Sequence, residues 1–181
     1  MRHPLFIAAA VSLTLTASVS AQDTKHEDMA NCSMHAQKET QYPHHADVNR
    51  HGDLAMGFPH DKTTHHFRLR SDGGAIEITA NDSNDKTNTA AIRAHLSHVA
   101  GLFSQGDFST PMFIHDTIPP GIETMRLLKA AIRYRFEELP TGARLNIESS
   151  NPAAVAAVHD FLRFQISDHQ TGDPITVADS H

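Results

Sequence analysis

The chain has 181 residues, one cysteine, 15 histidines and a formal net charge of −6 at pH 7. Because binding to nucleic acid depends on a basic surface, the acidic balance argues against a nucleic-acid partner. A single cysteine excludes an intramolecular disulfide, so the fold is expected to depend on its apolar core alone.

Residues 1–21 have the pattern of a secretory signal peptide. Arg2 and His3 form a basic start, an apolar run follows, and 19-VSA-21 supplies small residues at the cleavage positions. The apolar run is too short to span a bilayer comfortably, and no later segment approaches the roughly 18 apolar residues of a membrane helix. We therefore expect a periplasmic or secreted protein without membrane insertion.

Residues 22–56 are polar and show no apolar periodicity. Such a segment buries too little apolar surface to offset the entropy lost on ordering, so we expect a disordered leader. Within it, Cys32, Met34 and His35 offer a thiol, a thioether and an imidazole, which together suit Cu(I). The alternative is a solvated leader that binds nothing.

Residues 57–173 are expected to form one domain with an internal repeat, followed by a flexible tail at 174–181. Two similar halves, 67–107 and 134–173, each contain two alternating runs joined by a glycine-containing turn, and then an amphipathic segment. The alternation predicts β-hairpins, and the spacing of apolar residues in the third segment predicts a helix.

The helices also carry signals at their ends. Asn151 before Pro152 predicts the N-cap of the second helix, with Gly172 as its C-cap, and 119-PPG-121 starts a shorter helix between the halves. Hairpins with one apolar face, combined with amphipathic helices, predict an α+β fold: a four-stranded antiparallel sheet from two ββα repeats, with helices packed on one face. The order of the strands stays open.

Three motifs occur together in this domain: MGFPHDKTTHHF at 56–67, PMFIHD at 111–116 and HDFLRFQISDHQTGD at 159–173. In this combination the chain resembles a family of small exported bacterial proteins of unknown function, over nearly the whole domain. Some members of that family carry the name aspartate carbamoyltransferase. That enzyme needs a basic phosphate-binding loop at a helix N-terminus, which this sequence lacks, so the resemblance implies no catalytic residue.

Four histidines of the domain are expected to face one space between the sheet and the helices. They are His65 on the first strand and His95, His159 and His169 on the apolar stripes of the two helices. His98 lies at the margin of its stripe. Imidazoles bind zinc and copper well, so converging rings would form a metal site. The alternative is that each ring donates to a backbone carbonyl and is structural.

His115 ends an apolar connector, Pro111 to Asp116. If the chain turns there, Asp116 is expected to orient His115, as carboxylates orient histidines that bind metals. The alternative is a packed loop without a functional role.

The open face of the predicted sheet carries charged side chains of both signs. They are Arg68, Arg70, Arg133, Arg135, Arg144, Glu77, Glu137 and Glu148, with His66 on the same face. Cross-strand ion pairs on a solvated sheet explain this composition. The alternative is docking of an anionic ligand or protein.

The favoured function is periplasmic binding or sequestration of copper or zinc. The alternative is a small-ligand or protein-interaction module whose histidines are structural. An enzyme is not favoured, because the sequence has no nucleophile elbow and no recognisable pair of acids. The oligomeric state stays open.

Overall fold

The structure is a computed structural model that describes residues 32–177, with side chains from His44 onward. The first half of the repeat comprises β1 (Thr63–Arg70), β2 (Gly73–Ala80) and α2 (Lys86–Gln105). The second half comprises β3 (Ile132–Leu139), β4 (Gly142–Ser149) and α5 (Pro152–Asp168). The remaining elements are α1 (Cys32–Met56), the 3-10 turns η1 (His60–Lys62) and η2 (Lys129–Ala131), α3 (Ser109–His115) and α4 (Ile122–Leu127).

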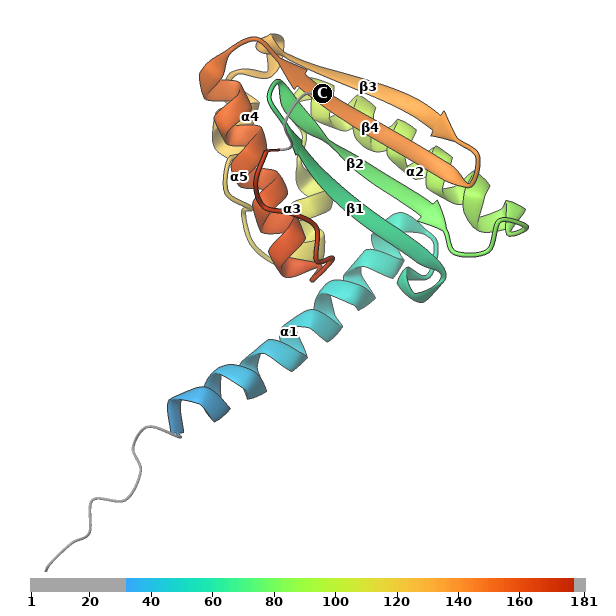
Figure 1. The fold of residues 1–181 in the computed structure, drawn as a ribbon, viewed down its shortest axis with the longest axis vertical. Helices are drawn as coiled ribbons and strands as arrows, with labels where there is room; N and C mark the ends of the chain where they lie inside the picture. Colours follow the sequence, from blue (N-terminus) through green and yellow to red (C-terminus); the bar gives the residue numbers. More distant parts are fainter. Residues whose placement is uncertain (1–31, 178–181) are drawn as a thin grey trace, which may run out of the picture.

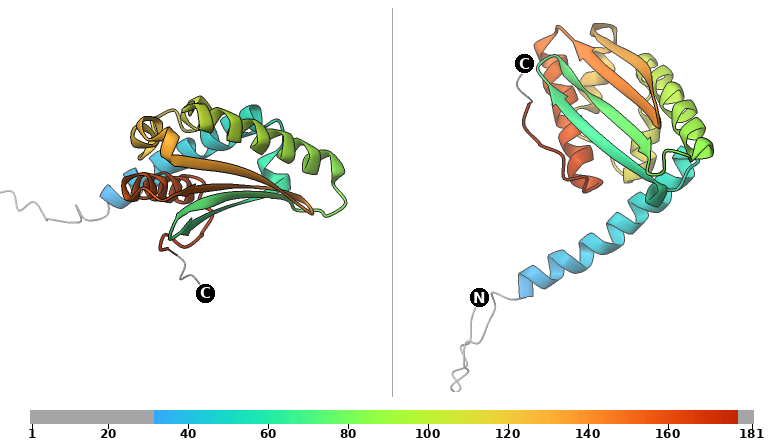
Figure 2. Two further views of the ribbon diagram at one scale, coloured as in Figure 1. Left: turned by 90° about the horizontal axis from the view of Figure 1, so that it is seen from above. Right: turned by 45° about the vertical axis from the view of Figure 1, so that its right-hand side comes forward.

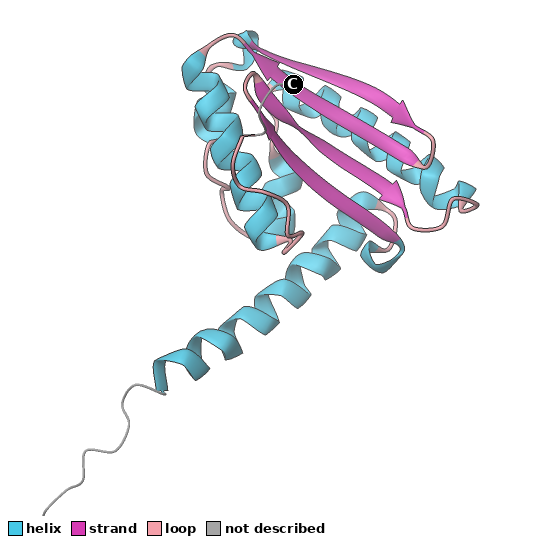
Figure 3. Cartoon of the chain, in the orientation of Figure 1, coloured by secondary structure: helices cyan, strands magenta, loops and turns pink. Residues whose placement is uncertain are grey.

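The four strands form one antiparallel sheet in the order β1-β2-β4-β3 (Figure 1, Figure 3). The two hairpins therefore join through their second strands, and Ile76 of β2 lies opposite Leu145 of β4. This arrangement confirms the predicted α+β fold with helices packed against the sheet. It also supplies the strand order that the sequence left open.

One face of the sheet is buried under the helices, and α2 runs along this sheet in Figure 2. Phe67 and Leu69 of β1 are almost fully buried, as their alternation with arginines predicts. At Gly74 of β2 an added Cβ would collide with the backbone of Arg68 and with Leu162 of α5. The absence of a side chain at this position therefore lets α5 pack directly on the first hairpin.

The N-cap predicted for α5 is present, because the Asn151 side chain accepts hydrogen bonds from the next two free backbone N–H groups. The end of α5 differs from the prediction. The helix stops at Asp168, and Gln170 adopts a left-handed conformation with φ of 53°. The chain then turns back to β1, where the Asp173 carboxylate accepts a hydrogen bond from the backbone N–H of Phe67.

Residues 32–56 form helix α1, which corrects the expectation of a disordered leader for this part of 22–56; residues 22–31 lie outside the described residues. The helix projects from the body of the protein and meets it at its C-terminal end (Figure 1). There Val48, Gly52 and Met56, at intervals of four residues, form a buried stripe. This stripe is too short, and too interrupted by glycine, to stand out in the sequence.

No helix within residues 32–177 is long and apolar enough to cross a membrane. The proposed signal segment, 1–21, lies outside the described residues, as do residues 178–181 of the predicted tail.

Candidate functional site

A cavity of about 60 Å³ lies between the sheet, the end of α1 and helices α2, α3 and α5; we call it the inner cavity. Most of its wall is aliphatic or aromatic. The side chains with nitrogen, oxygen or sulfur atoms on this wall are Met56, His65, His95, Thr110, Gln165 and His169. The inner cavity therefore brings together three of the four histidines that were predicted to converge.

Each of these three histidines comes from a different element. His65 is on the buried face of β1, His95 is on α2, and His169 directly follows α5. The rings of His65 and His169 are parallel to within 2°, with centroids 5.9 Å apart. His95 contacts Phe58 edge-on, at 5.8 Å between centroids. The imidazoles are thus held by aromatic packing rather than by acids.

Met56, the last residue of α1, contributes a thioether to the same wall. Its Sδ atom lies 3.3 Å from Nε2 of His65. Sequence reasoning did not single out this residue, because Met56 was assigned to the end of the leader. The sequence carries no clear signal for it, because the buried stripe of α1 is short and interrupted by glycine.

Burial lowers the pKa of all three histidines. The pKa falls to about 4 for His65, where burial and the neighbouring His95 are the main causes, and to about 4 for His95, where His98 adds to burial. It falls to about 3 for His169, through burial and the charges of His115 and His65. The three rings are therefore neutral at pH 7, the form in which imidazole binds metals.

His115 lies behind His169, with ring centroids 4.9 Å apart. It is buried at the end of α3, so residues 111–116 belong to a helix and its cap rather than to a loop. Its Nδ1 atom is 2.5 Å from Oδ2 of Asp168, and its Nε2 atom is 3.0 Å from Oε1 of Gln165. The carboxylate that orients His115 is thus Asp168 and not the adjacent Asp116, which corrects the sequence prediction.

Asp168 also binds helix α1. Its other oxygen, Oδ1, lies 2.8 Å from Nε2 of His44. Partial burial opposes ionisation of Asp168, but the hydrogen bonds from His115 and His44 outweigh it and hold the pKa of this carboxyl below its usual range. One ionised side chain therefore connects α5 with α3 and α1 beside the inner cavity.

A second and larger space, of about 280 Å³, lies between α1 and β1; we call it the outer cleft. It shares Met56, His65 and His169 with the inner cavity, so these side chains separate the two spaces. Two other histidines of the cleft are paired with acids: His60 with Asp53 at 2.9 Å, and His66 with Asp173 at 2.8 Å. The outer cleft therefore has acids beside its histidines, in contrast to the inner cavity.

The other predicted ligands are not part of the inner cavity. His159 lies elsewhere on α5. Its Nε2 atom is 2.8 Å from the backbone oxygen of Arg70, so this ring has the structural role that was the alternative to metal binding. His98 is exposed on α2. The side chains of Cys32, Met34 and His35 lie outside the described residues, although their backbone belongs to α1.

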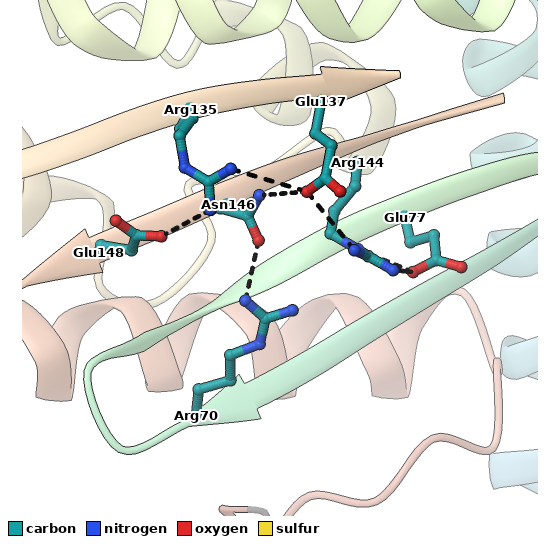
Figure 4. Close-up of polar contacts among 7 residues, drawn as sticks. All are labelled: Arg70, Glu77, Arg135, Glu137, Arg144, Asn146 and Glu148. Atoms are coloured by element: carbon teal, nitrogen blue, oxygen red, sulfur yellow. Dashed lines mark hydrogen bonds and ion pairs between the residues drawn. The ribbon is translucent and has the colours of Figure 1, made fainter. Parts of the chain in front are cut away.

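The open face of the sheet carries the predicted cross-strand ion pairs (Figure 4). Arg144 of β4 binds Glu77 of β2 at 2.8 Å and Glu137 of β3 at 3.5 Å. The network extends through further contacts to Asn146, Arg70, Arg135 and Glu148. The three glutamates of this face pair with Arg135 and Arg144, whereas Arg70 binds Asn146. Cross-strand ion pairs therefore account for part of the charge on this face, and docking of an anionic ligand or protein stays the alternative.

Across the part of the chain that the structure describes, no three His, Cys, Asp or Glu side chains are grouped closely enough to hold a metal ion. A site made by histidines alone is therefore not preassembled among these residues. No family model, curated protein or solved structure matches the chain. The family resemblance of the three motifs stays a prediction.

Proposed function

We propose that the protein is an exported copper-binding protein that holds Cu(I) between Met56 and His65, beside His95 and His169. The observation that supports this most strongly is the 3.3 Å separation between the Met56 sulfur and Nε2 of His65. In the structure these atoms lie within reach of a weak hydrogen bond from Nε2 to sulfur. On binding, the ring proton of neutral His65 would be on Nδ1, so that the lone pair of Nε2 and the thioether sulfur both face the ion.

The separation of these two atoms suits a common metal ion. With a metal–nitrogen distance of about 2.0 Å and a metal–sulfur distance of about 2.3 Å, it corresponds to a nitrogen–metal–sulfur angle of about 100°. This angle is close to tetrahedral. Met56 and His65 are therefore able to chelate one ion without a change of backbone, and His169 or His95 would supply a third ligand after a rotation of the ring.

The chemistry of the wall favours Cu(I) over zinc. A thioether is a soft ligand that selects Cu(I), whereas structural zinc takes four ligands, mostly thiolates and imidazoles. Among the described residues that line the inner cavity, none is Asp, Glu or Cys. Soft, uncharged donors in an apolar setting fit a monovalent ion better than a divalent one.

The expected consequence for the cell is sequestration of copper outside the cytoplasm. This part of the proposal rests on the secretory pattern of residues 1–21 and on the number of histidines in the chain. Cys32, Met34 and His35 offer a second set of soft ligands at the start of α1. The two sets must therefore be separated by experiment.

The test is a titration of the purified protein with Cu(I), in competition with a chromophoric chelator. We expect one ion to bind with a dissociation constant below about 1 μM, and Met56→Leu with His65→Gln to weaken binding at least tenfold. His159→Gln is the matched control, because this ring contacts a backbone oxygen away from the cavity. A second variant removes the thiol, thioether and imidazole at positions 32, 34 and 35.

Two results would contradict the proposal. Wild-type protein without micromolar affinity for Cu(I) would favour a small-ligand or protein-interaction module with structural histidines. Binding that survives in the Met56 and His65 variant, but is lost when positions 32, 34 and 35 are changed, would move the site to the N-terminal end of α1.

A further inference from the structure

One buried amide on the wall of the inner cavity lacks a hydrogen-bond partner. Gln165 is 4% exposed, and its Oε1 atom contacts His115, but its Nε2 atom has no partner among the described residues. A buried donor left unpaired costs about 1–3 kcal/mol. If the amide is turned by 180°, Nε2 faces His115 and the oxygen is left instead. In either orientation one polar atom of Gln165 is free to bind a ligand.

The size of the inner cavity limits what it holds. An engineered cavity of about 150 Å³ binds benzene, which has six non-hydrogen atoms. The inner cavity measures about 60 Å³, which corresponds to two or three such atoms.

The walls limit the charge of the ligand. Ile76, Ile78 and Val99 are among the apolar residues that line the cavity, and no described lining residue is Asp, Glu, Lys or Arg. A charged molecule that is not itself coordinated, as Cu(I) would be by Met56 and His65, would lose its hydration without gaining an opposite charge, which is costly in an apolar site. An uncharged molecule with one hydrogen-bonding atom meets no such penalty.

We propose that the inner cavity binds a small uncharged molecule of two or three non-hydrogen atoms, oriented by the Gln165 amide at one side. Met56, His65 and His169 line the same cavity, so the same molecule would complete the coordination of bound Cu(I). This second part rests on the proposed copper site. The ligand class is that of neutral molecules of two or three non-hydrogen atoms, for which carbon monoxide is the probe.

The first experiment uses metal-free protein and xenon, which dry apolar cavities bind. We expect saturable binding of xenon, detected by its NMR shift, and a several-fold loss of affinity in Val99→Ile, where the added methyl group occupies the cavity. Val158→Ile is the matched control, because Val158 is buried but does not line the cavity. The proposal would be overturned if xenon shows no saturable binding, which is the result expected when water fills the cavity. It would also be overturned if both variants lose affinity equally.

The second experiment uses Cu(I)-loaded protein and carbon monoxide, followed by infrared spectroscopy. We expect one narrow C–O stretching band in wild-type protein, and a shift of that band in Gln165→Leu, because the amide no longer polarises the ligand. A band that is absent, or unmoved by the substitution, would exclude the joint site. Because xenon is tested without metal, failure of copper binding leaves the cavity proposal testable by itself.

Discussion

The stability of the metal-free protein is expected to fall steeply between pH 6.5 and pH 4.5. An unfolded histidine has a pKa near 6.5, whereas burial lowers the pKa to about 4 for His65 and His95 and to about 3 for His169. In this range the unfolded chain takes up protons that the folded chain does not, so lowering the pH favours unfolding. The penalty is absent above pH 6.5 and complete below about pH 3.

The size of the effect follows from the same values. At pH 5, preferential protonation of the unfolded chain lowers the free energy of unfolding by about 2 kcal/mol for one histidine whose pKa in the folded protein is about 4. Three such groups remove up to about 6 kcal/mol, which is comparable to the total stability of a small domain. Asp168 and Asp173, whose pKa values lie below the ordinary value of 3.8, add to the loss only at lower pH.

The assay is urea denaturation with a chelator present, at several values from pH 7.5 to pH 5. The variant His169→Asn should lose part of the pH dependence, because one buried titrating group is gone. NMR titration of the imidazole protons identifies the groups directly. A stability that stays constant from pH 7.5 to pH 5, or three imidazoles that titrate near pH 6.5, would refute the reasoning.

Four further substitutions test the packing around the site and the cap of α5. Gly52→Ala should improve the helix propensity of α1 by up to about 1 kcal/mol but weaken Cu(I) binding, because its Cβ would lie 3.3 Å from the Met56 methyl carbon. Gly101→Ala on α2 is the control, because a Cβ there meets nothing within 4 Å; it should stabilise the protein without changing the affinity for Cu(I). If the two variants bind Cu(I) equally well, the contact between position 52 and Met56 does not affect binding. Asp168→Asn should cost about 1.5–3 kcal/mol in urea denaturation, since hydrogen bonds to an ionised group are lost, and an unchanged midpoint would count against this linkage. Asn151→Ala should cost about 1 kcal/mol through loss of the α5 N-cap, and a thermal melt that matches wild type would show that the cap contributes nothing.

The sequence predicts the two hairpins and the N-cap of α5 because these depend on local patterns. Phe67 and Leu69 alternate with arginines, and Asn151 precedes a proline. The strand order does not follow from such patterns, because pairing of β2 with β4 depends on how the two halves pack together. Helix α1 was missed for a related reason: its buried stripe is stabilised by contacts with the domain and not by its own propensity.

For the site, periodicity identifies which histidines face inward but not how far apart they lie. His159 lies on α5 and His169 directly follows this helix, but ten residues at about 1.5 Å per residue separate them by about 15 Å, so only His169 reaches the inner cavity. The partner of His115 is equally invisible in the sequence, because Asp168 lies 53 residues away. Met56 and Gln165 become candidates only when the cavity that they line is known.

The central claim is that Met56 and His65 bind the same copper ion, and X-ray absorption spectroscopy of Cu(I)-loaded protein tests it most directly. The expected spectrum of wild-type protein contains one sulfur neighbour at about 2.3 Å and one or two nitrogen neighbours at about 2.0 Å. In Met56→Leu the sulfur neighbour should disappear while nitrogen neighbours remain. A wild-type spectrum without sulfur, or a sulfur neighbour that persists in Met56→Leu, would contradict the account.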